Sequence, residues 1–235
     1  KIGPFKFQLK QVLFIDDDHL YVLLESGEVF WLSGEEYEIK KSAFGTNSIW
    51  GIDVHPDNPH DFYCALESGQ VVKYQIMHSS QQLLPEIKKI FLSQDFGFGR
   101  IRRAIPLRDK SYLAISTSGI VFRSTEKNII LWKFQTGGIC RDIAIDEKEL
   151  TCVVGNEAGE VIKLETKAGN LLWKTQLQFP AFSICFDHAN RIYVSERTLS
   201  SDEKSEVWLY ILDALDGAVI DRVNIPGYCK RIKRL

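Results

Sequence analysis

The stretch Glu157-Ala158-Gly159-Glu160-Val161 is one copy of a short turn that occurs four times along the chain. The other copies read Glu-Ser-Gly-Glu-Val at 25–29, Glu-Ser-Gly-Gln-Val at 67–71 and Thr-Ser-Gly-Ile-Val at 117–121. Each copy follows one short apolar run and precedes another. Because glycine supplies the positive φ that a tight strand-to-strand turn needs, each copy predicts a β-hairpin at the same place in a repeating unit.

Each repeating unit contains four short apolar runs, which we interpret as four strands. In the first unit the predicted strands are 12–15, 19–24, 28–32 and 37–40. Later units begin at Trp50, Ile101 and Cys140 and near Phe182, and the fifth carries a polar insertion at 197–205. Short strands at this spacing predict an all-β fold, a β-propeller of four-stranded antiparallel blades. A large β-sandwich is the alternative, but it would not explain the returning turn.

The repeat divides the chain into five blades and two partial strands. The predicted limits are 11–44, 50–93, 101–136, 140–178 and 182–225 for the blades, and 4–10 and 228–235 for the partial strands. We expect one propeller domain over residues 1–235. Since the partial strands match only the outer and inner strands of a further blade, we also expect a section of a longer propeller or an incomplete ring.

The segment 164–174, Leu-Glu-Thr-Lys-Ala-Gly-Asn-Leu-Leu-Trp-Lys, closely resembles the repeat of the pyrroloquinoline-quinone-like (PQQ-like) propeller superfamily. Residues 128–133 resemble the second half of that repeat and 212–218 the first half, whereas Gly-Ile-Asp-Val-His-Pro-Asp at 51–57 resembles a turn of WD40 propellers. We expect Trp132, Trp173 and the turn glycine Gly169 to pack neighbouring blades together. The superfamily includes many non-catalytic scaffolds, so the resemblance does not imply the cofactor, and we predict none.

Composition excludes several classes of protein. The 235 residues are 45% hydrophobic, with 29 basic and 31 acidic side chains and a net charge of −2, so no global field attracts nucleic acid or an anionic membrane. No apolar run is long enough to span a bilayer, and residues 1–10 lack the core of a signal peptide. The five widely spaced cysteines predict buried free thiols, and therefore a reducing, cytoplasmic location.

Three short motifs have simpler explanations than catalysis or metal binding. The run Asp16-Asp17-Asp18-His19 lies in a predicted turn and lacks the spacing of a calcium loop. His55 and His60 flank two prolines and fit a longer hairpin turn. Asp95-Phe96-Gly97 lacks the other kinase motifs and is interpreted as a linker. We predict no metal site and no catalytic residues.

One set of residues predicts a binding site. We aligned the units on Leu13, Ile52, Ile105, Ile143, Ile184 and Ile232, which we take as the first inward aliphatic residues of the inner strands. The residues two places earlier are Gln11, Trp50, Arg103, Arg141, Phe182 and Lys230, with Arg102 and Arg231 beside them and Lys10 near. The three cations and two aromatic residues of this set are expected to ring the mouth of the central channel, where guanidinium groups and aromatic rings suit an anionic partner. The alternative is that the arginines pair with neighbouring acids such as Asp53 and Asp142.

These features predict a non-catalytic recognition module, a scaffold or sensor rather than an enzyme. Its expected partner is another protein or another domain of the same chain, and an acidic peptide or a phosphate-bearing ligand would suit the arginines. Two alternatives stay open. One is a propeller enzyme, either a quinoprotein oxidoreductase or a hydrolase; the other is a nucleic-acid-binding propeller that uses the arginines and the basic tail 230–234.

Overall fold

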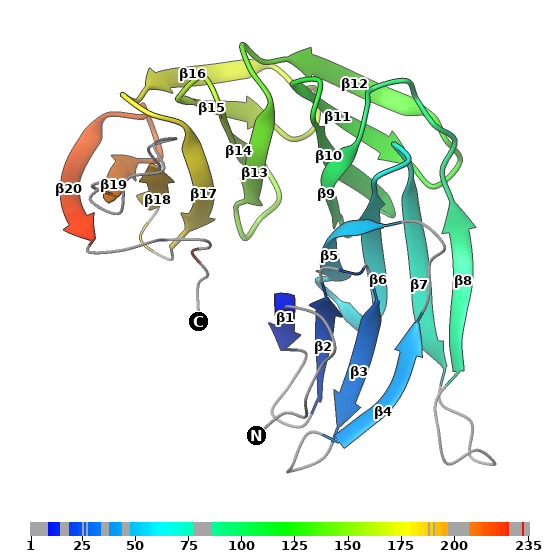
Figure 1. The fold of residues 1–235 in the computed structure, drawn as a ribbon. Helices are drawn as coiled ribbons and strands as arrows, with labels where there is room; N and C mark the ends of the chain where they lie inside the picture. Colours follow the sequence, from blue (N-terminus) through cyan, green and yellow to red (C-terminus); the bar gives the residue numbers. More distant parts are fainter. Residues whose placement is uncertain are drawn as a thin grey trace. The chain divides into compact units, whose positions relative to one another are not determined.

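The protein is a β-propeller built from five four-stranded antiparallel sheets, each of which is one blade (Figure 1). The computed structural model describes residues 9–14, 19–24, 26, 28–33, 38–43, 48–77, 86–187, 189, 191–196, 207–225 and 232. In every blade the strands lie side by side in chain order, so each strand pairs with the next through a hairpin. The predicted fold class is confirmed. The predicted partial strands at 4–10 and 228–235 fall largely outside the described residues.

We number the blades along the chain and call their strands inner, second, third and outer. Blade 1 contains β1 Leu9–Phe14, β2 His19–Leu24, β3 Val29–Ser33 and β4 Glu38–Ala43. Blade 2 contains β5 Ile49–His55, β6 Asn58–Leu66, β7 Val71–Met77 and β8 Glu86–Leu92. Blade 3 contains β9 Ile101–Pro106, β10 Ser111–Ser116, β11 Ile120–Thr125 and β12 Ile130–Gln135. Blade 4 contains β13 Cys140–Ile145, β14 Thr151–Asn156, β15 Glu160–Glu165 and β16 Leu171–Gln176. Blade 5 contains β17 Ala181–Phe186, β18 Arg191–Glu196, β19 Val207–Asp213 and β20 Val219–Ile225.

The predicted strands agree with the structure best where a hairpin limits both ends. The prediction of 19–24 matches β2, whereas the inner strand predicted at 12–15 runs from Leu9 to Phe14. The inner strand is longer because a β-bulge between Leu9 and Gln11 continues the pairing with β2 toward the N-terminus. The hairpin at His55 is also tighter than predicted, since His55 pairs with Asn58 across a turn at residues 56–57.

The chain forms two compact units. One comprises residues 1–114 and 124–129, and the other residues 115–123 and 130–235, so the sheet of blade 3 contributes to both. The prediction of a single domain over 1–235 stays a prediction.

In the first unit, buried aliphatic and aromatic side chains of blades 1 and 2 form one core, which includes Tyr21, Ile52 and Phe62. Gln11 of β1 ties the two inner strands together, because its side-chain amide donates to the Ile52 carbonyl and accepts from the Ile52 N–H. Gln11 is therefore a buried residue with a structural role.

A half-buried lysine, Lys73, joins the third strand of blade 2 to the turn between β11 and β12. Lys73 Nζ lies 3.0 Å from Asp61 Oδ2 and 3.0 Å from Glu126 Oε1. Burial alone would lower the pKa of Lys73, but its hydrogen bonds to Asp61 and Glu126 outweigh burial and raise it. The Tyr63 hydroxyl also donates to Glu126, so this turn is held by two donors from blade 2.

In the second unit, side chains of one blade also hold a turn of the next blade, here through a backbone carbonyl and at two further seams. At the seam of blades 3 and 4, the carbonyl oxygen of Thr166 accepts from Trp132 Nε1 at 2.9 Å and from Arg123 Nη1 at 3.2 Å. At the seam of blades 4 and 5, the Ala214 carbonyl accepts from Trp173 Nε1 at 3.1 Å and from Lys163 Nζ at 2.6 Å. A tryptophan and a cation thus bind one turn carbonyl of the following blade.

The turn glycines fit against the indole rings at these seams. Gly169 has a φ of +72°, and a Cβ there would lie 2.5 Å from Trp132 Cδ2. Gly217 has a φ of +75°, and a Cβ there would lie 2.6 Å from Trp173 Cε3. These turns require glycine both for the left-handed backbone conformation and for the close approach of the ring.

Candidate protein-interaction site

The inner strands begin with a β-bulge that turns one side chain out of the regular ladder. The pairing register shifts between Ile49 and Gly51 in β5, between Cys140 and Asp142 in β13, and between Ala181 and Ser183 in β17. The extra residues are Trp50, Arg141 and Phe182, and all three are half-buried beside a fully buried neighbour. A bulge re-aims the extra side chain, which explains why these residues are only half-buried between buried neighbours.

Blade 3 has Arg102 at this position. In β9, Ile101 is buried, Arg102 is half-buried and Ala104 is buried, which matches the start of β13. The sequence alignment placed Arg103 in this set with Arg102 beside it, and Arg103 is half-buried as well. We refer to Trp50, Arg102, Arg141 and Phe182 as the bulge residues.

The bulge residues of consecutive blades contact each other as cation–π pairs. In the first unit, the guanidinium carbon of Arg102 lies 5.3 Å from the centroid of the Trp50 ring, and that of Arg100 lies 5.9 Å from it. In the second unit, the guanidinium carbon of Arg141 lies 5.4 Å from the centroid of the Phe182 ring. Each unit therefore presents an arginine packed on an aromatic ring from the adjacent blade.

Neighbouring acids balance much of the arginine charge. Arg103 binds Asp53 through two parallel hydrogen bonds, of 2.9 Å from Nε and 2.7 Å from Nη2. Arg141 forms an ion pair with Glu157. The alternative interpretation from the sequence holds for Asp53. Asp142 Oδ2 accepts hydrogen bonds from Ser183 Oγ and the Ile184 N–H, both at 3.0 Å. Among the bulge residues, Arg141 thus has a carboxylate partner.

The ring of cations around one channel stays a prediction. Trp50, Arg102 and Arg103 lie in one unit, and Arg141 and Phe182 lie in the other. Lys230 and Arg231 lie outside the described residues.

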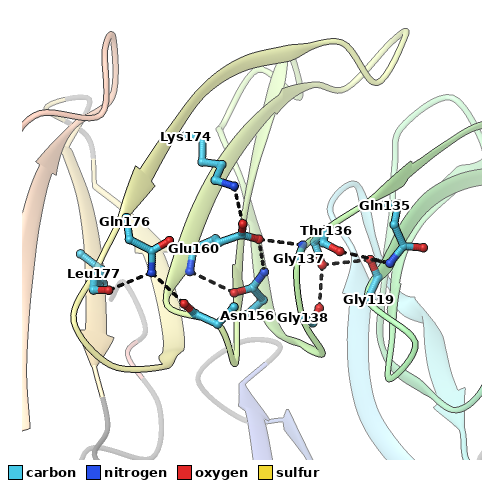
Figure 2. Close-up of polar contacts among 11 residues, drawn as sticks. Gly119, Gln135, Thr136, Gly137, Gly138, Asn156, Glu160, Lys174, Gln176 and Leu177 are labelled. Atoms are coloured by element: carbon cyan, nitrogen blue, oxygen red, sulfur yellow. Dashed lines mark hydrogen bonds and ion pairs between the residues drawn. The ribbon is translucent and has the colours of Figure 1, made fainter.

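A buried carboxylate anchors the loop that leads into β13 (Figure 2). Glu160, at the start of β15, accepts hydrogen bonds from the Gly137 N–H at 2.7 Å and from Asn156 Nδ2 at 2.6 Å, and it pairs with Lys174. Burial alone would raise the pKa of Glu160, but these donors outweigh burial and hold it below its ordinary value. Glu160 therefore fixes the backbone a few residues before Arg141.

Side chains at the ends of β12 and β16 hold the adjoining loops in the same way (Figure 2). Gln135 Nε2 donates to the Gly119 carbonyl at 3.2 Å, and Gln176 Nε2 donates to the Ala158 carbonyl at 2.7 Å. Thr136 Oγ1 bridges the carbonyls of Gly119 and Gly138. Sequence analysis missed these residues, although an alignment of the two outer strands would have placed Gln135 and Gln176 together.

The motifs set aside during sequence analysis have structural roles where they are described. Asp95 Oδ1 accepts from the Gly97 N–H at 2.8 Å, which closes a turn between β8 and β9. His55 Nδ1 accepts from the Asp57 N–H at 3.2 Å. The acidic run 16–18 lies outside the described residues. Over the part of the chain that the structure describes, no three His, Cys, Asp or Glu side chains are grouped to hold a metal, and no helix could cross a membrane.

The four-stranded antiparallel sheets define the class, a β-propeller. The crystal structure of Saccharomyces cerevisiae Sqt1, a WD40 β-propeller, matches this chain with a TM-score of 0.73 at 10% sequence identity. The match covers 92% of this chain and 62% of the Sqt1 chain, so this chain spans less than two thirds of that structure. No protein-family model and no curated protein matches the sequence. The likeness therefore shows the fold alone.

Proposed function

We propose that the chain is a non-catalytic recognition module that binds a partner protein through the bulge residues. The observation that carries the proposal is the repeated packing of an arginine on an aromatic ring, Arg102 on Trp50 and Arg141 on Phe182. Tryptophan, tyrosine and arginine are the residues that most often dominate the energy of protein interfaces. Here they are half-buried, so part of each side chain stays available to a partner.

The surrounding structure supports the proposal because it holds these side chains in place before binding. The inner strands are tied to one another across blades. Gln11 of β1 accepts from the Ile52 N–H of β5, and Asp142 of β13 accepts from the Ile184 N–H of β17. Glu160 and Thr136 fix the loop before β13. A rigid site loses little conformational entropy when it binds, which favours affinity.

The chemistry of the bulge residues indicates a mixed partner surface. Arg141 and Arg103 already have carboxylate partners, so a free anion gains little from them. A protein segment that stacks aliphatic groups on Trp50 in one unit, or on Phe182 in the other, and places a carboxylate at the edge of the adjacent guanidinium group would use both features. We therefore favour an acidic protein segment over a phosphate-bearing small molecule.

Replacing Trp50 and Phe182 together with alanine is expected to weaken partner binding by at least about thirtyfold, since the loss of even one interface hot spot costs about 2 kcal/mol or more. The measurement is affinity capture with quantitative mass spectrometry from extracts of the cells that make the protein, followed by titration of the partner recovered. Leu215→Ala is the matched control, because Leu215 is 87% exposed in the turn between β19 and β20, at the other end of the strands.

The thermal midpoint of each variant is measured alongside binding. Retained binding by a folded Trp50→Ala/Phe182→Ala variant would contradict the proposal, as would equal loss in the Leu215→Ala control. Charge reversal of Arg103 is a poor test, because a glutamate there would face Asp53 and destabilise the blade.

A further inference from the structure

The connection between β8 and β9 is longer than the fold requires. It covers residues 93–100, whereas the corresponding connections into β13 and β17 cover only 136–139 and 177–180. All three lead from the outer strand of one blade to the inner strand of the next. Because four residues are enough to join such strands elsewhere in the chain, the additional residues serve something other than chain closure.

Both ends of this connection, which we call the phenylalanine loop, are fixed to the turn between β6 and β7. At one end, the buried hydroxyl of Ser93 accepts from the Val71 N–H at 2.8 Å, and the Ser93 carbonyl accepts from Gln70 Nε2 at 2.8 Å. At the other end, Arg100 Nη1 lies 3.3 Å from Glu67 Oε1. The phenylalanine loop therefore has a fixed base.

The middle of the phenylalanine loop carries two aromatic rings. The Gly97 N–H donates to Asp95 Oδ1 at 2.8 Å, and Gly97 and Gly99 adopt positive φ values of 73° and 72°. This backbone brings the rings of Phe96 and Phe98 together, with centroids 6.0 Å apart and planes inclined by 20°. Both phenylalanines are half-buried, so part of this stacked pair is accessible to a partner.

The stacked pair lies beside the Trp50 surface. Phe98 is two residues from Arg100, so their Cα atoms are at most about 7 Å apart. The guanidinium carbon of Arg100 lies 5.9 Å from the centroid of the Trp50 ring, the same ring on which Arg102 packs. All of these residues belong to the first unit. The phenylalanine loop therefore extends the Trp50 surface by two aromatic rings and one guanidinium group.

The charges around these rings suit a single carboxylate better than a chain of phosphates. The side chains of Arg100 and Glu67 are 53% and 41% exposed, so their ion pair is weak and a carboxylate of a partner can replace Glu67. Arg103 is held by Asp53 through two hydrogen bonds, and Asp95 is exposed on the loop. A single-stranded nucleic acid is bound by a continuous positively charged groove, which these acids interrupt.

We propose that the phenylalanine loop binds an aromatic side chain of the partner segment, and that Arg100 binds a carboxylate next to that side chain. This inference rests on the proposed function and names the chemistry that the first unit recognises. Stacked aromatic rings attract each other more strongly than their buried area alone explains. A guanidinium group binds a carboxylate through two parallel hydrogen bonds. The partner segment therefore carries phenylalanine, tyrosine or tryptophan beside aspartate or glutamate.

Two synthetic peptides test the carboxylate. Both carry one central phenylalanine in a glycine–serine background, and the residue after it is either glutamate or glutamine. Fluorescence anisotropy with the whole chain is expected to show that the glutamate peptide binds about tenfold more tightly. Arg100→Gln is expected to abolish that preference. Arg108→Gln is the matched control and is expected to keep it, because Arg108 forms a similarly exposed ion pair with Asp57 beyond the other end of β9.

Phe98→Leu tests the stacking, because it removes the ring and keeps an apolar side chain. It is expected to weaken the glutamate peptide about fivefold or more. Met77→Ala is the matched control, since Met77 is 41% exposed at the end of β7 that lies away from the loop. A peptide with cyclohexylalanine in place of phenylalanine tests the same stacking on the wild-type protein, to which it must bind more weakly. Thermal midpoints show that each variant is folded.

The inference is wrong if neither peptide binds, if Arg100→Gln leaves the preference unchanged, or if a single-stranded thymidine oligonucleotide binds more tightly than the glutamate peptide. The partner recovered by affinity capture separates this failure from a failure of the proposed function. If that partner loses affinity for Trp50→Ala/Phe182→Ala but not for Arg100→Gln or Phe98→Leu, only the inference is wrong. If it binds all of these variants as it binds the wild type, both are wrong.

Discussion

Gly169→Ala, at the seam of blades 3 and 4, is expected to destabilise the protein by about 2–4 kcal/mol. Two costs add. The left-handed conformation, with φ at +72°, costs an L-residue about 1–2 kcal/mol, and the new Cβ would lie 2.5 Å from the Trp132 ring. The ring cannot move away freely, since its Nε1 is bonded to the Thr166 carbonyl. Urea unfolding followed by circular dichroism measures the loss.

Gly97→Ala separates these two costs. Gly97 has nearly the same backbone conformation, with φ at +73°, but a Cβ there would meet nothing within 4 Å. Gly97→Ala is therefore expected to cost only the backbone part, about 1–2 kcal/mol. Equal losses for Gly97→Ala and Gly169→Ala would show that the Trp132 contact does not constrain the seam.

Glu160→Gln is expected to destabilise the protein by about 2–3 kcal/mol at pH 7, because it replaces a buried carboxylate that accepts hydrogen bonds with an amide. The Glu160 side chain is 9% exposed, and its carboxylate accepts hydrogen bonds from the Gly137 N–H and Asn156 Nδ2 and pairs with Lys174. The matched control is Glu165→Gln, since the Glu165 carboxylate accepts one exposed hydrogen bond, from Asn170 Nδ2 at 2.8 Å. The control is expected to lose less than about 1 kcal/mol.

The effect of Glu160→Gln is also expected to depend on pH. The pKa of Glu160 is lowered in the folded protein, so its ionised form stabilises the fold above the ordinary carboxylate pKa. That stabilisation is lost as the pH falls through the lowered pKa, when the folded carboxylate takes up a proton. The difference in unfolding free energy between wild type and Glu160→Gln should therefore shrink from pH 7 to pH 3, and a constant difference would contradict the role of the charge.

The sequence predicts the blades well because their hairpins are specified locally. Gly119 and Gly159 adopt the positive φ that the repeated turn implies, and the strands on either side follow from it. The outer-strand tryptophans also lie where the PQQ-like resemblance places them, since Trp132 and Trp173 each contact the turn of the next blade. Local turn chemistry and local motifs are the kinds of information that a single sequence carries.

The sequence does not predict the bulges or the contacts across long separations. Arg102 and Arg103 are adjacent and chemically identical, so only the position of a bulge decides which one faces Trp50. Glu160 lies in the repeated turn, but the corresponding residues of the other copies are Glu28, Gln70 and Ile120. Its bond to the Gly137 N–H depends on a loop 23 residues away, which no local pattern marks.

Photo-crosslinking tests the recognition role of the bulge residues most directly. A benzophenone amino acid placed at position 50 or 182 is expected to cross-link a partner protein in the cells that make this chain, and the same group at Leu215 is expected to give no such product. Mass spectrometry of the adduct identifies the partner and the peptide attached. Cross-links from position 215 with none from positions 50 and 182 would contradict a partner site at the bulge residues.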